Sequence, residues 1–366
     1  MKAGNKNNLD RLKLINIIKF HTAMTQRSKT LEFLIPSYKR PQSFVRAVLS
    51  VASQVEELNL GDRVKVTVVD DCSPNIDLAE TIAAISPFSQ FVSVRQNDKN
   101  KGMSLNIRDM VAECVADFCT VLTDDDLLQQ DSLKQIIETI DNLDKEQRTV
   151  GSFFVPRYSY LEDGTLECIV CNPFSKDTTI APGSLSSLQY LENGFILTGM
   201  FFNPKLINFE LWEDHIENSF FPVIYFADLL LSYESLFINK NWFVHTVNNE
   251  CHWDSWGKTE QQRLSRLYND YIKAVTLSAK QSLARESSSL AKIGLLKQEF
   301  LRYEDQMNSV LPRLSKSSRN TDRSMLLRLP YLLAVVYYSL SRFKLSLKKV
   351  FSKMKTSTNS LMQARQ

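Results

Sequence analysis

The sequence predicts an α/β fold with a mostly parallel sheet flanked by helices. Short apolar, β-branched segments alternate with helical patterns between residues 31 and 130, at the spacing that crossover connections need. Charged or polar residues follow each of these segments. Because the carboxyl ends of parallel strands share one rim, where such sheets bind ligands, this rim is the predicted functional site.

Four strands and two helices are predicted in order. The first strand covers residues 31–35, and Pro41 opens a helix that runs through Leu49 at helical spacing. The remaining predicted elements are a strand at 64–69, a strand at 91–95, a helix from 101 to about 116 and a strand at 118–123. We expect four groups to converge after these strands: Pro36 to Arg40, Asp70 with Asp71, Arg95 to Asn97, and Asp124 to Asp126.

Three consecutive carboxylates, Asp124, Asp125 and Asp126, follow the fourth strand. Placing that much negative charge at the end of a buried strand is costly unless a cation shares it. Hard divalent ions bind in this way to one or two carboxylates together with substrate phosphates. The cluster therefore indicates a metal and a phosphate-bearing substrate. The alternative is a solvated acidic turn that caps the next helix.

Four motifs along the chain resemble those of glycosyltransferase family 2 enzymes, which have the Rossmann-like GT-A fold. They lie at residues 35–40, 69–73, 97–106 and 122–126. The resemblance is close over residues 31 to about 130 and continues loosely to about residue 256. It implies transfer of a sugar from a nucleotide diphosphate donor to a hydroxyl group, with inversion at the anomeric carbon.

The resemblance also implies roles for individual residues. It places Tyr38 and Arg40 beside the nucleotide and one acid of the Asp70–Asp71 pair on the base or ribose, whose N–H and hydroxyl groups are donors. Asp125 matches the family's metal-binding acid, and the ion, Mn²⁺ or Mg²⁺, would neutralise the departing diphosphate as a Lewis acid. The predicted substrate-binding residues are Pro36, Tyr38, Arg40, Asp70, Asp71, Arg95, Lys101, Asn106 and Asp124, and the predicted metal ligands are Asp125, Asp126 and His252.

A general base and a histidine complete the site that the resemblance implies. Inversion needs a base for the attacking hydroxyl, and the family keeps this acid on a helix after a Gly-rich acceptor segment. Residues 194–200 resemble that segment and residues 225–231 the helix start, so Asp228 is the predicted base, although Ala227 replaces the usual glutamate. The alternatives are the acids Glu234, Asp214 and Glu217, or an Asp228 that only favours the helix macrodipole. His245 is the alternative to His252, and a hydrogen-bonded structural histidine is the competing interpretation.

The chain is expected to divide into an N-terminal extension (1–30), a catalytic domain (31–256), a C-terminal helical region (257–312) and a basic amphipathic tail (313–366). The catalytic domain would comprise a nucleotide-sugar-binding half (31–130) and an acceptor half (131–256). The tail has twelve Lys and Arg against one acid, whereas the whole chain carries a net charge of only +3. Its apolar run is shorter than the roughly 20 residues of a spanning helix. This pattern favours binding to an anionic membrane surface over a helix packed on the catalytic domain, and nucleic acid is not an expected partner.

The remaining features indicate where the protein acts. The first 30 residues lack the apolar core of a signal peptide, and six cysteines do not form a disulfide scaffold. We therefore expect a cytoplasmic protein on the inner face of the cell membrane, acting on a glycan or lipid-linked acceptor in surface polysaccharide (O-antigen or capsule-like) biosynthesis. One alternative is a non-catalytic, membrane-attached assembly partner with a degenerate transferase fold. The other, a sugar-phosphate nucleotidyltransferase, would need a Gly-rich phosphate loop after the first strand.

Overall fold

The computed structural model describes residues 27–74, 78–160, 165–170, 174–182, 197–218 and 220–246, together with residue 270. The chain divides into two compact units, residues 1–289 and 290–366, and every described residue belongs to the first. The predicted tail therefore lies outside the described residues, as do most of the N-terminal extension and of the helical region. Within the described part, no helix is both long enough and apolar enough to cross a membrane.

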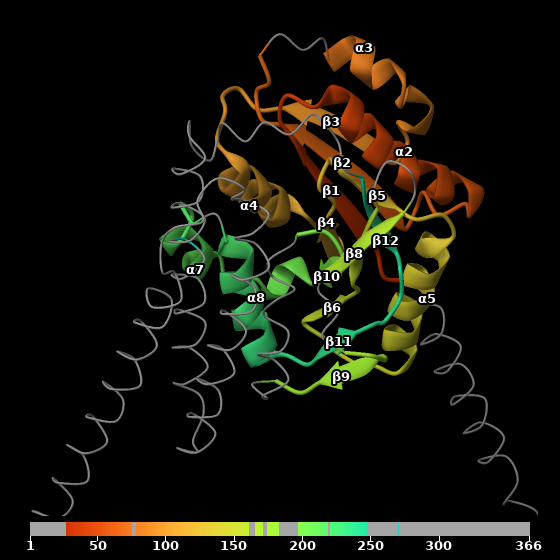
Figure 1. Ribbon diagram of the computed structural model, residues 1–366, viewed down its shortest axis with the longest axis vertical. Coiled ribbons are helices and arrows are strands. Elements are labelled where there is room, and N and C mark those ends of the chain that lie inside the picture. The colour runs from red at the N-terminus through yellow and green to blue at the C-terminus, as the bar shows by residue number, and fades with distance from the viewer. Residues whose placement is uncertain are drawn as a thin grey trace, which may run out of the picture. The chain divides into compact units, whose positions relative to one another are not determined.

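An eight-stranded sheet with the strand order β3-β2-β1-β4-β10-β6-β11-β9 forms the centre of the domain (Figure 1). The four strands predicted from the sequence are all present and parallel to one another: β1 (Leu31–Ser37), β2 (Val64–Asp70), β3 (Val92–Gln96) and β4 (Phe118–Val121). The other half consists of the short strands β6 (Ser152–Phe154), β9 (Thr178–Ile180), β10 (Met200–Phe202) and β11 (Ser235–Phe237). β10 is antiparallel to both β4 and β6, so β6 runs in the direction of β4.

Pro36 lies inside β1, although a proline cannot donate a hydrogen bond to a neighbouring strand. β1 pairs with β2 along its whole length, but β4 pairs with β1 only as far as Leu34. Beyond Leu34, β1 has a neighbour on one side only, which makes a proline tolerable there. The strand therefore continues two residues past its predicted end and delivers Ser37 and Tyr38 to the rim of the sheet.

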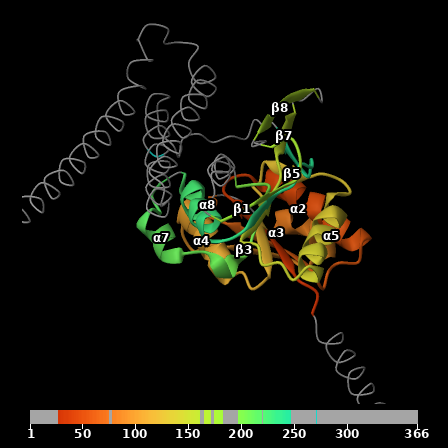
Figure 2. The ribbon, with the colours of Figure 1, turned by 90° about the horizontal axis from the view of Figure 1, so that it is seen from below.

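Helices cover both faces of the sheet. α2 (Pro41–Glu57), α3 (Leu78–Ala83) and α5 (Ser132–Lys145) lie on one side, and α4 (Met103–Glu113), α7 (Phe209–Asp214) and α8 (Phe221–Ser232) lie on the other (Figures 1 and 2). Two 3-10 turns, Ser86–Phe88 and Pro204–Leu206, complete the described helical elements. The helix predicted from Pro41 is α2, and it buries Phe44, Val48 and Val51 in the core. Each buried side chain of this size contributes about 1.5–3 kcal/mol.

A second, four-stranded sheet has the order β5-β12-β7-β8. Its strands are β5 (Asp126–Leu128), β12 (Phe243–Thr246), β7 (Arg157–Tyr160) and β8 (Leu166–Val170). β12 is antiparallel to β5 and parallel to β7, and His245 is the register partner of both Asp126 and Ser159. This sheet, which the sequence did not predict, therefore places Asp126 and His245 side by side.

The interpretation of Asp124 to Asp126 as a solvated turn capping the next helix is wrong. Asp126 is fully buried as the first residue of β5, and Asp124 is also buried. The next helix, α5, begins only at Ser132, after Asp131 at its N-cap. The buried acids therefore need a reason other than solvation or capping.

Candidate active site

The carboxyl ends of β1 to β4 meet at one rim, as the sequence predicts. Ser37 is level with Asp70 in the register of β1 and β2, and Asp70 is level with Gln96 in that of β2 and β3. Backbone hydrogen bonds continue past the strand ends, because the Asp71 N–H donates to the Ser37 carbonyl at 2.8 Å. The rim is therefore held together by the backbone before any side chain contributes.

Arg40 joins the first strand end to the acidic cluster. Its Nη1 donates to Asp124 Oδ1 at 2.9 Å and lies 3.7 Å from Asp125 Oδ2. Burial raises the pKa of Asp124, Arg40 lowers it, and the neighbouring Asp125 and Asp126 raise it again, so that the pKa is about 7. Arg40 alone does not balance the charges of Asp124 and Asp125, which is the condition under which a further cation is favourable.

The raised pKa of Asp124 predicts a pH-dependent stability. Its ordinary pKa is 3.8, so between about pH 4 and 7 the unfolded chain has lost this proton while the folded chain retains it. The free energy of unfolding therefore falls as pH rises through this window. Urea denaturation in EDTA is expected to show Asp124→Asn gaining about 1–2 kcal/mol relative to the unsubstituted protein between pH 5 and 8, part of the full linkage being offset by the lost Arg40 pair. The exposed Asp62→Asn is the control, and a difference for Asp124→Asn that does not change with pH would contradict the prediction.

Asp126 accepts hydrogen bonds from three directions. Thr123 Oγ1 donates to its Oδ2 at 2.7 Å, Arg157 Nη1 lies 3.3 Å from the same oxygen, and His245 Nδ1 lies 2.8 Å from Oδ1. Burial alone raises the pKa of Asp126, but Arg157, His245 and Thr123 lower it to about 2. Asp126 is therefore an ionised, fully buried carboxylate.

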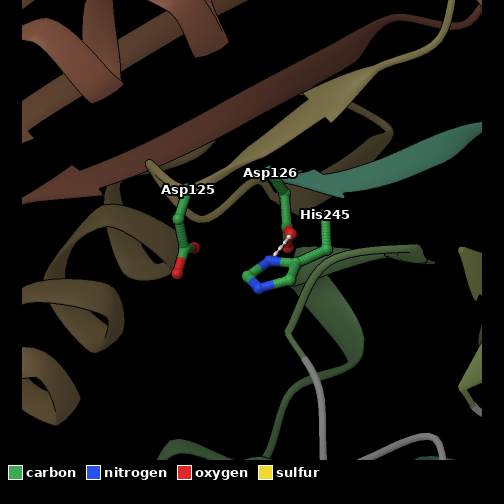
Figure 3. Close-up of side chains that lie close together, drawn as sticks. All are labelled: Asp125, Asp126 and His245. Atoms are coloured by element: carbon green, nitrogen blue, oxygen red, sulfur yellow. Dashed lines mark hydrogen bonds and ion pairs between the residues drawn. The ribbon is translucent and has the colours of Figure 1, made fainter. Parts of the chain in front are cut away.

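Asp125, Asp126 and His245 offer a group of possible metal ligands (Figure 3). Their ligand atoms lie within 4.8 Å of one another, and no other group of three acids, cysteines or histidines in the described part of the chain is this close. Two carboxylates and an imidazole fit a divalent ion such as Mn²⁺, and the unbalanced charge around Asp124 favours one. His245, the alternative to His252 in the sequence analysis, is thus one of the candidate ligands, whereas His252 lies outside the described residues.

Asp70 and Asp71 are both buried, and all four of their oxygens accept hydrogen bonds within the protein. Asp70 accepts from the Ser73 backbone and hydroxyl and from Gln96 Nε2. Asp71 accepts from Asn97 Nδ2 and from the backbone N–H groups of Lys101 and Gly102, at 2.7–2.9 Å. These acids shape the loops after β2 and β3, so the geometry does not favour the predicted direct contact with a base or ribose.

An open cleft of about 460 Å³ lies at the end of β3. Arg95 and Lys101, both predicted to bind substrate, line it together with Lys99, and they form ion pairs with Glu113 and Asp109. Asn106, also predicted to bind substrate, is buried and does not line the cleft; its side chain accepts from Asn97 Nδ2 and donates to the Val69 carbonyl. The three cationic side chains outnumber Asp98, the one acid of the lining, so the cleft suits an anionic ligand that competes with Glu113 and Asp109 for Arg95 and Lys101.

The described part of the predicted acceptor segment, residues 197–200, lies directly against the acidic cluster. The Thr198 hydroxyl accepts from the Thr123 N–H at 3.1 Å and lies 3.0 Å from the Thr123 hydroxyl. Gly199 has φ of +95°, and a Cβ there would lie 3.1 Å from the Val155 carbonyl oxygen. A glycine is therefore needed for the chain to pass this close and to present Thr198 to the cluster.

Asp228 is half-buried on α8, but α8 does not start where the sequence predicted. The helix begins at Phe221 with Pro222 in its first turn, so Asp228 is its eighth residue. This excludes the alternative that Asp228 is an acid of the first turn. Tyr225 and Phe226, the residues before it, pack on Phe202 of β10.

The rival acids are placed less favourably. Glu234 pairs with Arg148, and its carbonyl accepts from Gly151 just before β6 and β11 begin, which is the rim opposite the acidic cluster. This position excludes Glu234 as the base. Asp214 and Glu217 are exposed at the end of α7 and just after it.

Comparisons with known proteins agree with these features. A family model described as glycosyl transferase family 2 matches residues 32–182, whereas a search of curated proteins finds no significant match. The crystal structure of S. aureus TarS residues 1–349 is similar to this chain with a TM-score of 0.53 and 13% identity, covering 83% of this chain and 79% of that one. The same TarS fragment in complex with UDP-GlcNAc has a TM-score of 0.52 and 14% identity, covering 76% and 73% of the two chains.

At these identities the TarS structures show the fold, and the family match covers all four motifs that the rim is built from. The predicted mostly parallel sheet, flanked by helices, is confirmed. Residues 32–182 are therefore similar to glycosyl transferase family 2, and the chain has the fold of the GT-A glycosyltransferases.

Proposed function

We propose that this protein is an inverting glycosyltransferase that moves a sugar from a nucleotide diphosphate sugar to a hydroxyl group of a glycan or lipid-linked acceptor. The observation that carries the proposal is the rim of the family 2 domain, where Arg40, Asp124, Asp125 and His245 converge. The carboxylates, the guanidinium and the imidazole at this position suit the binding of a metal and a diphosphate better than the binding of a neutral ligand. The TarS fragment has been crystallised with UDP and with UDP-GlcNAc, which makes UDP the first nucleotide to test.

Different residues of the rim would contact different parts of the donor and its metal ion. Asp125 and His245 would hold the divalent ion, and the ion would supply positive charge to the departing diphosphate. Arg40 keeps Asp124 in place and lies 3.7 Å from Asp125, so it limits the repulsion between the acids. Lys99, Lys101 and Arg95 offer the cationic cleft beside β3 to the nucleotide.

Asp228 is the general base of the proposed reaction. Its half-buried position on α8 distinguishes it from the exposed Asp214 and Glu217. α8 packs on β10, and the residues before β10 bond to Thr123 beside the acidic cluster. α8 therefore packs on the short strand that follows Thr198, the residue bonded to Thr123 beside the acidic cluster.

The charge of the C-terminal tail is the basis for the proposed acceptor and location. Residues 313–366 carry twelve basic residues against one acid, and we propose that they hold the enzyme on the anionic inner face of the cell membrane. A lipid-linked acceptor in surface polysaccharide biosynthesis is consistent with that position. The nucleotidyltransferase alternative is disfavoured because β1 is followed by Tyr38, Lys39 and Arg40 and not by a Gly-rich phosphate loop.

Calorimetric titration with UDP, GDP, ADP and CDP, each with and without Mn²⁺, tests the proposal. We expect one nucleotide diphosphate to bind in the presence of Mn²⁺ and its binding to weaken at least about tenfold when EDTA removes the metal. If folded protein binds none of the four, the glycosyltransferase proposal fails. The non-catalytic assembly partner would then be the better description of this chain.

A further inference from the structure

Asp126 and its neighbour Asp125 lie in different surroundings. The side chain of Asp126 is completely buried, whereas those of Asp125 and His245 are 22% and 23% exposed. Thr123, Arg157 and His245 already surround the two oxygens of Asp126. An ion that enters from the rim therefore meets Asp125 and His245 first, and a bond to Asp126 would bring it beside the Arg157 cation.

The strand register holds Asp126 and His245 together. They are 119 residues apart in the sequence, yet they are direct partners in the antiparallel pairing of β5 with β12. Arg157, on β7 at the other side of β12, supplies a third contact within the same sheet. The 2.8 Å contact between Asp126 Oδ1 and His245 Nδ1 is thus built into the fold.

This contact determines which nitrogen of His245 carries the proton in the neutral ring. A carboxylate that pairs with Arg157 and accepts from Thr123 has no proton of its own to donate, so a hydrogen bond at Nδ1 requires the proton to be on Nδ1. Nε2 then keeps its lone pair. In Figure 3, Nδ1 points to Asp126, and the other ring nitrogen lies on the edge of the ring that is turned away from it.

We propose that Asp126 is a positioning residue: it fixes the Nδ1–H tautomer and the ring orientation of His245, so that Asp125 and Nε2 of His245 hold the ion without a direct bond to Asp126. The proposal rests on the metal site of the proposed function and changes the role predicted for Asp126. Carboxylates that accept from a ligating histidine commonly raise metal affinity in this way.

The first test needs neither metal nor substrate. Long-range ¹H–¹⁵N NMR of ¹⁵N-histidine-labelled protein at pH 8 in EDTA separates the two tautomers, and the chain has only four histidines. His245→Gln identifies the signals of His245. We expect the Nδ1–H tautomer in the unsubstituted protein and a shift towards Nε2–H in Asp126→Asn, because an amide can donate to Nδ1. An Nε2–H tautomer in the unsubstituted protein would overturn the proposal without any variant at Asp126.

The second test measures the affinity for Mn²⁺ alone by the EPR signal of the free ion. Asp126→Asn is expected to bind Mn²⁺ about 10–100-fold more weakly, and the double variant with His245→Gln is expected to bind no more weakly than His245→Gln alone. Asp141→Asn, which breaks the ion pair of Asp141 with Arg63 far along the sheet, is the matched control and should change neither Mn²⁺ affinity nor tautomer.

Additive losses in the double variant would show that Asp126 binds the ion directly and would overturn the proposal. A loss of stability in Asp126→Asn with unchanged tautomer and Mn²⁺ affinity would assign it a purely structural role and would also overturn it. Both measurements are made without a nucleotide or an acceptor. A failure of the glycosyltransferase proposal in the nucleotide titrations is therefore distinguishable from a failure of this one.

Discussion

Asp125→Asn is expected to lower sugar transfer by about 10²–10³-fold and to remove the Mn²⁺ dependence of nucleotide binding. Asp125 is the partly exposed acid of the rim and shares the metal-ligand group with His245. The amide keeps the shape of the side chain but loses its charge, so the ion would lose its main anionic ligand. Transfer is measured with the nucleotide sugar whose nucleotide binds in the titrations.

The exposed Asp62→Asn is the control for this substitution, because it removes the same charge at a distance from the rim. Asp125→Asn should unfold at a urea concentration no lower than that of the control, since the repulsion between Asp125 and the buried Asp124 is relieved. Undiminished transfer by a folded Asp125→Asn protein would remove Asp125 from the site. In EDTA, Asp125→Asn and Asp62→Asn should bind the nucleotide with the same affinity, which is weaker than that of the control with Mn²⁺.

The first half of the sheet could be predicted from the sequence because β1 and β2 are long and all four strands alternate with helical patterns. The strands of 64–70 and 31–37 are seven residues each, and their observed ends differ from the predicted ones by one or two residues. Parallel pairing then brings the strand ends together without further information. The convergence of Arg40 with Asp124 and Asp125 follows from this pairing and is confirmed.

The second sheet could not be predicted, and with it the pairing of Asp126 with His245. β5 and β12 have only three and four residues, which is too short for a period of two to stand out. Their partners are more than 100 residues apart. The closeness of His245 to Asp126 therefore became visible only in the fold.

One detail of the site depended on the direction of side chains, which a strand pattern does not give. The sequence placed Asp70 and Asp71 at the rim, but it could not show that their oxygens turn inward to Ser73 and to the Lys101–Gly102 backbone. The start of α8 did leave a signal that the sequence analysis missed. Pro222 is suited to the first turn of a helix, and it predicts a start near Phe221 instead of Tyr225.

Asp228→Asn is expected to lower transfer by about 10²–10⁴-fold while leaving Mn²⁺-dependent donor binding within about twofold. A general base acts on the acceptor hydroxyl, so its loss slows the chemical step without changing the contacts to the nucleotide. Transfer at saturating donor, together with calorimetric donor binding on the same preparation, separates the two effects. If transfer and donor binding fell by the same factor, the substitution would be disturbing the fold of α8, and Asp228 would not be acting as the base.

Glu234→Gln supplies the matched control for Asp228→Asn. It removes a carboxylate six residues further along the chain and breaks the pair with Arg148, but Glu234 lies at the opposite rim of the sheet. We expect it to lower stability and to leave transfer unchanged. If Asp228→Asn transfers sugar normally and Asp214→Asn or Glu217→Gln does not, the base comes from α7 or the turn after it. Ala227, in place of the usual glutamate, would then agree with a base that lies on α7 or just after it and not on α8.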